Sequence, residues 1–257
     1  MREIETPEIL AIKSGRSRAE YCWTLTPFLP KKVMEMAPSA QRVTYVDADC
    51  WFINDPRRIF QEMDDAGKDV LITPHHYLPQ HDLSATSGIY CVQFMPFRRT
   101  PAGIHVLLWW QERCLEWCFA RLENNRFGDQ KYLDHWPEKF KNAVHVLGNP
   151  LYTLAPWNAS RYGDCLNIAE QGCLYHFQGL RIYKKWRICL CISGAYLLPG
   201  NILEQIYSPY LENIASIKKD LWKRGIQIDF AAQTMFDRLI GLAGWIRNRK
   251  KRTWHKI

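Results

Sequence analysis

The sequence lacks an apolar run long enough to cross a membrane. A spanning helix needs about 20 mostly apolar residues, whereas the best candidate, residues 186–198, is shorter and is interrupted by Arg187, Ser193 and Gly194. The first ten residues, MREIETPEIL, are acidic and lack the apolar stretch of a signal peptide. We therefore expect a soluble, cytoplasmic protein.

The sequence also lacks a CxxC pair, and its nine cysteines are an odd number. A disulfide framework in a secreted chain would be denser and evenly numbered, so we expect reduced thiols. Cys114 and Cys118 lie one helical turn apart, and Cys189 and Cys191 share one face of a predicted strand. Neither pair has a third or fourth soft ligand nearby in the sequence, which argues against a zinc site.

Acidic residues are missing from the C-terminal tail. The 257 residues carry a net charge of +8, but residues 247–257 hold six Lys or Arg and no acid, so the remainder carries only +2. This distribution argues against nucleic acid as a partner. The tail and the amphipathic helix predicted at residues 230–246 could contact anionic lipid at the inner face of a membrane. Alternatively, that helix packs on the core and the tail is solvated.

The order of predicted elements indicates an α/β fold. A hydrophobic fraction of 47% and a charged fraction of 23% are ordinary for a globular chain of one or two domains. Asp55-Pro56 and Thr100-Pro101 each combine a cap residue with a first-turn proline. We expect strands at 42–46, 69–73, 89–94 and 143–147, and helices from 56 to Gly67, from 101 to about 123, at 129–136 (stopped by Pro137), at 202–217 and at 228–246. Strands alternating with helices are typical of an α/β sheet.

Two aspartates follow the first predicted strand, which is apolar enough to be buried on both faces. Asp47 and Asp49 flank one small residue where this strand ends, and ligands of open α/β sheets bind at the carboxyl ends of strands. Two carboxylates so placed can hold a hard cation such as Mg²⁺ or Mn²⁺. The alternative is that both aspartates only cap the turn after the strand.

The segment VTYVDADCWFIND, residues 43–55, resembles the aspartate motif of nucleotide-sugar glycosyltransferases with the GT-A fold, in particular the bacterial branch related to glycosyltransferase family 8. Further segments follow in the order used by that family: Thr86–Tyr90 (TSGIY), Phe127–Leu133 (FGDQKYL), Leu154–Asn158 (LAPWN), and His176–Gly179 (HFQG) followed by Lys184, Lys185 and Trp186. The resemblance spans roughly residues 18–186, and the ordered set is more specific than any single segment.

The resemblance implies a GT-A (Rossmann-like) mixed sheet flanked by helices, formed by residues 1–198, with a helical extension and basic tail at 199–257. It also implies a role for each motif residue. Asp47, Asp49 and His176 would bind Mn²⁺ or Mg²⁺; Asp129 and Gln130 would face the transferred sugar as catalytic residues; and Ser87, Gly88, Trp157, Asn158, Gly179, Lys184 and Lys185 would bind substrate. Trp157 and Trp186 are candidates for stacking on a sugar. No protein nucleophile is assigned.

Several of these residues have simpler explanations. A histidine in the apolar segment Leu174–Phe177 can be a satisfied core residue, and Gly179 can serve only its loop. Asp129 stands at a predicted helix start, where it could be the N-cap.

The sequence departs from the family at a few positions. Trp23 stands where family 8 enzymes carry an Arg that reaches the donor, Thr86 replaces an Asn, and Lys185 replaces a Pro, so the donor sugar could differ from glucose or galactose. The family also begins with a strand and helix that bind the nucleoside, about 60 or more residues ahead of Glu20. We expect this sequence to begin after that unit, as a fragment or from an internal start.

Together these features predict a metal-dependent, retaining hexosyltransferase. Its donor would be a nucleotide-diphosphate sugar, with a UDP-sugar favoured, and its acceptor a glycan or lipid-linked glycan of cell-surface polysaccharide biosynthesis. The alternative is a truncated, inactive GT-A-like domain that binds glycan or a partner protein.

Overall fold

The computed structural model describes residues 3–163, 167–183, 187–191, 196–228 and 254–256. The chain divides into two compact units. Unit 1 comprises Met1–Ala48, Arg57–Tyr77 and Asp82–Pro150, and unit 2 comprises Asp49–Pro56, Leu78–His81 and Leu151–Ile257.

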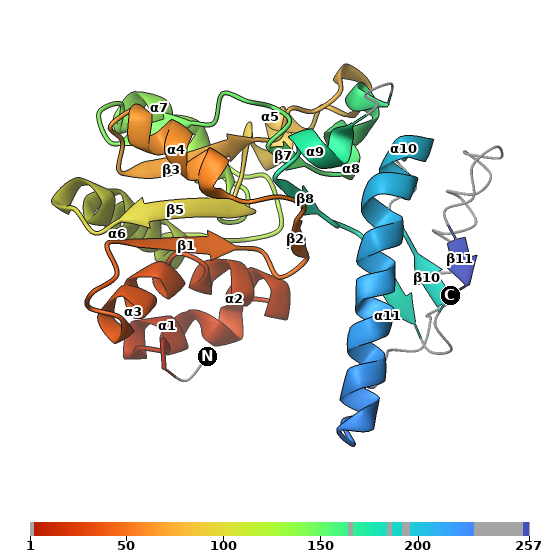
Figure 1. Ribbon diagram of the computed structural model, residues 1–257. Helices are drawn as coiled ribbons and strands as arrows, with labels where there is room; N and C mark the ends of the chain where they lie inside the picture. The colour runs from red at the N-terminus through yellow and green to blue at the C-terminus, as the bar shows by residue number, and fades with distance from the viewer. Residues whose placement is uncertain (1–2, 164–166, 184–186, 192–195, 229–253, 257) are drawn as a thin grey trace. The chain divides into compact units, whose positions relative to one another are not determined.

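Unit 1 combines a sheet with helices (Figure 1). Its helical elements are α1 (Pro7–Ile12), η1 (Lys13–Gly15), α2 (Arg18–Leu25), α3 (Phe28–Met36), α4 (Arg57–Asp65), α5 (Ser84–Ser87), α6 (Pro101–Glu116), η3 (Lys131–His135) and α7 (Trp136–Lys139). Its strands are β1 (Arg42–Val46), β3 (Val70–Pro74), β4 (Tyr90–Cys91), β5 (Phe94–Arg98) and β6 (Val144–Val146). In Figure 1, α1 to α3 are drawn below β1, and α4 and α7 above β3.

The sheet of unit 1 is mixed. Its described strands have the order β1-β5-β3-β4, with β6 also paired to β3. The β3–β6 pairing is parallel, and the other pairings are antiparallel.

The predicted mixed α/β fold is confirmed, and so are the strands expected at 42–46, 69–73 and 143–147. Only Val43 of β1 is buried and its other residues are half-buried, so the expectation of burial on both faces is wrong. Among the described strands, β1 ends the order and pairs with β5 alone.

Aromatic side chains form much of the core of unit 1. The Trp110 ring lies 6.4 Å from that of Phe97 and packs edge-on, 5.7 Å away, against Trp136. All three side chains are fully buried, together with Ile72 and Leu107. This packing holds α6 and α7 against the sheet and contributes to the apolar burial that stabilises unit 1.

The helix expected to run from residue 101 to about 123 is shorter. Thr100 caps its start by accepting from the N–H of Gly103, as predicted, but α6 ends at Glu116. Arg16 donates to the carbonyl oxygens of Cys114 and Leu115, each at 2.7 Å. A helix leaves such carbonyls unsatisfied at its C-terminus. Arg16, which is distant in the sequence, supplies the hydrogen-bond donors that a further helical turn would have provided.

Two other predicted elements also differ. The strand expected at 89–94 is interrupted by a turn at residues 92–93, where the buried Gln93 donates to Thr73 Oγ1 and its carbonyl accepts from Asp47. The helix expected at 129–136 is a 3₁₀ turn, η3, followed by α7. Pro137 lies in the first turn of α7 and does not stop a helix, because a first-turn proline loses no intrahelical hydrogen bond. The helix expected after Pro56 is α4, and Gly67 follows it with a φ of +61°.

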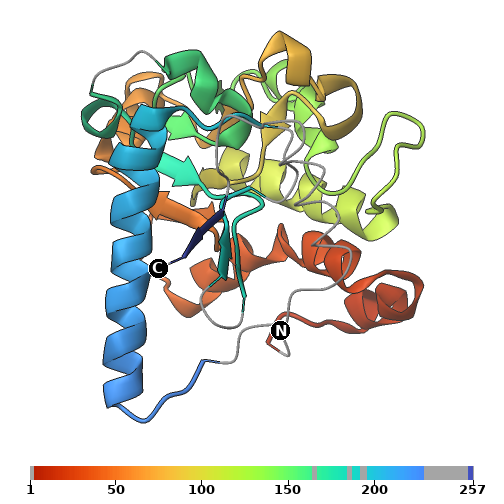
Figure 2. The same ribbon diagram turned by 90° about the vertical axis from the view of Figure 1, so that its right-hand side faces the viewer.

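Unit 2 holds two small sheets and a long helix (Figure 2). Its strands are β2 (Cys50–Phe52), β7 (Thr153–Leu154), β8 (Leu174–His176), β9 (Arg181–Tyr183), β10 (Arg187–Cys189) and β11 (Trp254–Lys256). Its helical elements are η2 (Pro79–His81), α8 (Pro156–Ala159), η4 (Ser160–Tyr162), α9 (Ile168–Gln171), α10 (Gly200–Ile202), the π-helical turn η6 (Leu203–Tyr207) and α11 (Ser208–Lys223). The sheets have the orders β2-β8-β7 and β11-β10-β9.

The helix expected at 202–217 is confirmed by the run from α10 to α11. Tyr210 of α11 stacks on Phe177, with 3.8 Å between ring centroids, and lies 5.6 Å from Trp51 of β2. The helix expected at 228–246 and the tail at 247–257 fall outside the described residues, except for Ile228 and β11. Within the described part of the chain, no helix has the length and apolar character needed to cross a membrane.

Adjacent leucines in α6 offer a matched test of this packing. Leu107 is fully buried, whereas Leu108 is 39% exposed. Leu107→Ala is expected to lower the free energy of unfolding by about 2–5 kcal/mol because it opens a cavity. Leu108→Ala is expected to cost less than about 1 kcal/mol. Urea unfolding followed by circular dichroism measures both, and equal losses would contradict the observed orientation of α6.

Candidate functional site

The turn between β1 and β2 carries both aspartates of the motif. Asp47 follows β1, and its N–H donates to the carbonyl of Gln93 at 3.0 Å. The Tyr45 hydroxyl donates to Asp47 Oδ1 at 2.7 Å. Residues i and i+2 of a strand project to the same face, so the register of β1 brings the Tyr45 hydroxyl to the carboxylate and orients it.

Strand pairing brings Asp49 to His176. In the antiparallel β2–β8 pair, Cys50 lies opposite His176, and the N–H of Phe177 donates to the carbonyl of Asp49 at 2.8 Å. The imidazole Nε2 of His176 lies 3.1 Å from Asp49 Oδ1. The imidazole is 8% exposed and the carboxylate 48% exposed, so the pair joins a buried nitrogen ligand to an accessible oxygen ligand.

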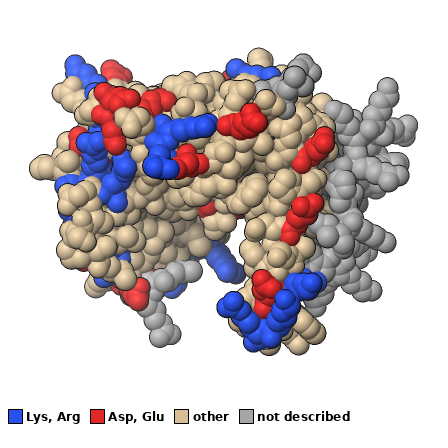
Figure 3. All heavy atoms as spheres, viewed as in Figure 1, with Lys and Arg blue, Asp and Glu red and all other residues tan. Residues whose placement is uncertain are grey.

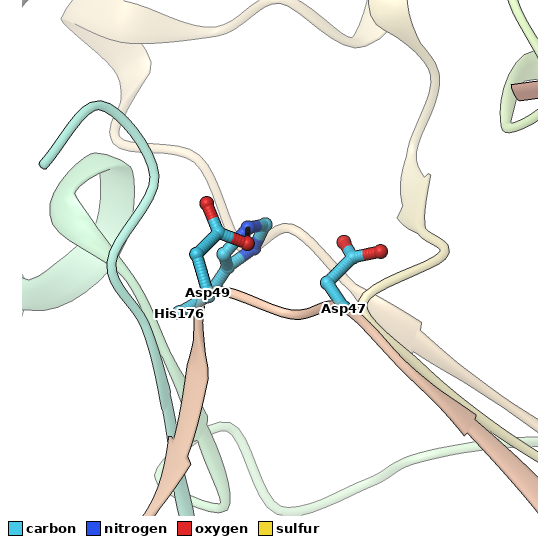
Figure 4. Close-up of side chains that lie close together, drawn as sticks. All are labelled: Asp47, Asp49 and His176. Carbon is cyan, nitrogen blue, oxygen red and sulfur yellow. Dashed lines mark ion pairs between the residues drawn. The ribbon is translucent and has the colours of Figure 1, made fainter. Parts of the chain in front are cut away.

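The three predicted metal ligands lie close together (Figure 4). Asp47, Asp49 and His176 each offer one ligand atom, and these atoms lie within 4.8 Å of one another. All three side chains point to the same side of the turn. Two carboxylates and one imidazole suit a divalent cation, and three protein ligands leave room in its shell for water or phosphate oxygens. The donor set therefore fits the predicted Mn²⁺ or Mg²⁺.

The pKa of Asp49 reflects two opposing effects. Its partial burial raises the pKa, but the hydrogen bond and the charge of His176 outweigh that effect and hold the pKa below its ordinary value. The carboxylate is therefore ionised at neutral pH and ready to act as a ligand.

Asp129 is a buried acid. The residue is 3% exposed, and the Trp110 indole donates to its carbonyl oxygen at 2.8 Å. Burial raises the pKa of its carboxyl group to about 7; the negative charge of Asp47 contributes further, against hydrogen bonds from Thr26 and the main chain. Oδ2 of this carboxyl is buried and has no hydrogen-bond partner among the described residues.

Thr26 and Tyr45 lie near Asp129 and Asp47. The Thr26 side chain lies beside both the Asp129 carboxyl group and the Tyr45 hydroxyl, and this hydroxyl donates to Asp47. Neither residue is among the site residues predicted from the sequence. Tyr45 could have been found from its place two residues before Asp47, whereas no sequence pattern marks Thr26.

The Ser87–Gly88 segment and Gln130 come together in unit 1. The Gln130 amide donates to the Ser87 carbonyl at 2.8 Å. Gly88 has a φ of +104°, a backbone conformation that favours glycine. Two motifs that are distant in the sequence are thus directly bonded, although a contact of either with substrate stays a prediction.

The remaining motif residues that the structure describes lie in unit 2. The Trp157 ring packs edge-on against His176, with 5.3 Å between centroids. Asn158 is 1% exposed, and its amide bonds to the main chain at Ala155 and Thr153, which gives it a structural role in its turn. Gly179 has a φ of +82° in the turn after His176. Lys184, Lys185 and Trp186 lie outside the described residues.

The raised pKa of Asp129 predicts a pH-dependent stability. The folded protein keeps this proton up to about pH 7, whereas the unfolded chain releases it near the ordinary pKa of 3.8. Between these values the folded state binds more protons, so this residue's contribution to stability falls as pH rises. From pH 5 to pH 8, wild type is expected to lose about 3 kcal/mol relative to Asp129→Asn. Urea unfolding at both pH values measures this difference.

Asp65→Asn, at an exposed aspartate, is the control and is expected to follow wild type. Parallel pH profiles for wild type and Asp129→Asn would contradict the raised pKa.

Comparison with solved structures finds partial likenesses, among them two glycosyltransferase structures. One is a glycosyltransferase involved in the glycosylation of the major capsid of PBCV-1, with a TM-score of 0.42 and 9% identity over 62% of this chain and 71% of that one. The other is mouse xyloside xylosyltransferase 1, with a TM-score of 0.38 and 16% identity over 66% of this chain and 69% of that one.

Sequence comparison finds relatives in Bacillus subtilis (strain 168). The chain is 34% identical to the uncharacterised protein YfnF over 191 residues, which cover 70% of this chain and 63% of YfnF. It is 31% identical to the uncharacterised protein YfnD over 224 residues, which cover 83% of this chain and 70% of YfnD. No protein-family model matches the sequence. On the identity and coverage of the YfnD match, the chain belongs to the protein family that includes YfnD of Bacillus subtilis.

Proposed function

We propose that this protein is a metal-dependent glycosyltransferase that moves a hexose from a nucleotide-diphosphate sugar, with a UDP-sugar favoured, to a glycan or lipid-linked acceptor. The observation that carries the proposal is the cluster of Asp47, Asp49 and His176, whose ligand atoms lie within 4.8 Å of one another. The order of the sequence motifs supports it, because these three residues are the ones at which the family resemblance implies a metal. Cell-surface polysaccharide biosynthesis is the pathway we propose.

In this proposal the metal ligands also organise the donor. Asp47, Asp49 and His176 hold Mn²⁺ or Mg²⁺, which when bound supplies the positive charge that a departing nucleoside diphosphate requires. The turn at Gly179 brings main chain near the diphosphate, and Lys184 and Lys185 pair with its oxygens. Ser87, Gly88 and Trp157 contact the donor sugar, and Asn158 supports the turn that presents Trp157.

Asp129 and Gln130 are the proposed catalytic residues. The buried Oδ2 of Asp129 lacks a partner among the described residues, and a sugar hydroxyl could donate to it. With a pKa of about 7, this carboxyl group could accept or share a proton at neutral pH. We propose retention of the anomeric configuration, without assigning a protein nucleophile.

The proposed location is the cytoplasm, with peripheral contact to the inner face of the membrane through the basic tail at 247–257. Most of that tail lies outside the described residues. The described C-terminal end of α11 supports the proposal. It carries Lys218, Lys219 and Lys223 beside Trp222, which is 65% exposed, and Arg224 follows the helix; Asp220 in the same turn pairs with Lys223 at 3.4 Å (Figure 3). Exposed Trp together with basic residues is typical of surfaces that contact anionic lipid.

Hydrolysis of a panel of UDP-hexoses with Mn²⁺ tests the proposed activity. Wild type is expected to release UDP in the presence of Mn²⁺ and to lose this activity in EDTA. Asp49→Ala and His176→Ala are expected to reduce the rate by at least about 100-fold because each removes a metal ligand.

Asp65→Ala, at an exposed acid in α4, is the matched control and should retain the wild-type rate. Equal rates in wild type and Asp49→Ala would contradict the metal role. Mn²⁺ binding without turnover of any donor would favour an inactive domain that binds glycan or a partner protein.

Tyr45→Phe is expected to weaken Mn²⁺ binding by about 10–100-fold, because outer hydrogen bonds orient metal ligands. Titration of free Mn²⁺ by electron paramagnetic resonance measures the affinity. Tyr132→Phe is a matched control, since it also removes one hydroxyl, which donates to the carbonyl of Trp117 at 2.8 Å. Equal affinities in the two variants would show that the Tyr45 hydroxyl does not orient Asp47.

A further inference from the structure

Three side chains of the 130–134 segment hold the main chain of residues 84–89. Lys131 Nζ donates to the Ser84 carbonyl at 2.8 Å, and the Gln130 amide donates to the Ser87 carbonyl, also at 2.8 Å. Asp134 Oδ1 accepts from the N–H of Ile89 at 2.7 Å. We call Gln130, Lys131 and Asp134 the η3 clamp.

The clamp contains a buried ion pair. Lys131 Nζ lies 2.9 Å from Asp134 Oδ2, and the two side chains are 5% and 11% exposed. Desolvation offsets much of the attraction within such a pair, so a buried pair is weak evidence for net stability. Here each charged group also bonds to the main chain of the 84–89 segment, which gives the pair a second, geometric role.

The clamped segment contains one short helix followed by a glycine turn. Its helix, α5, has only four residues, fewer than a helix needs to be stable alone. Gly88 then takes a φ of +104°, and a Cβ at this position would lie 3.2 Å from Asp134 Oδ1 and 3.3 Å from Lys131 Cα. The segment therefore lies directly against η3 and depends on it for its conformation.

From these contacts we infer that Lys131 and Asp134 are positioning residues that fix the Ser87–Gly88 turn for recognition of the donor sugar. This inference rests on the proposed function, in which Ser87 and Gly88 meet that sugar. The clamp occupies the carbonyls of Ser84 and Ser87 and the N–H of Ile89. The orientation of these main-chain groups is thus fixed before any ligand binds. Loss of the clamp should therefore weaken donor binding more than it slows turnover.

Lys131→Met, Asp134→Asn and the double variant test the inference. The Asp134→Asn side chain can still accept from the N–H of Ile89 but no longer neutralises Lys131, whereas Lys131→Met removes the bond to the Ser84 carbonyl. Each single variant is expected to raise the KM for the donor by about 10-fold, with kcat changed by less than about 3-fold. The double variant leaves no unpaired charge, so its thermal stability should be higher than that of the single variants, while its KM stays raised. If the pair had only a structural role, the KM would return toward the wild-type value together with the stability. Lys141→Met, at an exposed lysine, is the control.

Amide hydrogen exchange in the ligand-free protein gives a second readout. The N–H groups of Gly88 and Ile89 are expected to exchange at least about 10-fold faster in Lys131→Met than in Lys141→Met. Equal exchange in these two variants would overturn the inference whatever the kinetics. Mn²⁺-dependent turnover in wild type with an unchanged KM in Lys131→Met would also overturn it while leaving the proposed function intact. Loss of the proposed function would show itself differently, as equal turnover in wild type and Asp49→Ala.

Discussion

The pairing of β2 with β8 is the constraint on which the candidate metal site depends. It joins segments that are far apart in the sequence, sets Cys50 opposite His176, and fixes the Asp49 main chain through the N–H of Phe177. The 3.1 Å approach of His176 to Asp49 follows from that register. A slip of one residue would turn the histidine to the other face of the strand. Phe177, which directly follows His176, stacks on Tyr210 of α11 and so supports the same end of the strand.

The charge of Asp47, in the same turn, also affects a buried acid of unit 1. Tyr45 orients Asp47, and Thr26 lies beside both Tyr45 and the buried carboxyl group of Asp129. The charge of Asp47 is the second cause, after burial, of the raised pKa of Asp129. Anything that neutralises Asp47 therefore lowers the pKa of Asp129, so the ligand turn and the proposed catalytic residue are coupled by charge. Burying an acid in this way costs stability, which is common at functional sites.

The features predicted correctly from sequence are those that local signals determine. The strand before Asp47, the cap at Thr100 and the glycine after α4 each follow from the residues beside them. His176 was reached only through the order of motifs, because nothing around it distinguishes a ligand from a core histidine. The end of α6 could not be predicted, since the arginine that binds its last carbonyls, Arg16, is distant in the sequence. The roles of Thr26 and Lys131 were missed for the same reason, because their partners lie far away in the sequence.

We propose that Asp47, Asp49 and His176 bind one divalent cation together. Anomalous diffraction at the manganese edge, from crystals grown with Mn²⁺ and UDP, tests this binding. One strong peak is expected within bonding distance of both carboxylates and of His176 Nε2, with diphosphate oxygens completing the shell. A peak that excludes His176, or no peak at this turn at saturating Mn²⁺, would show that the three residues do not form one metal site.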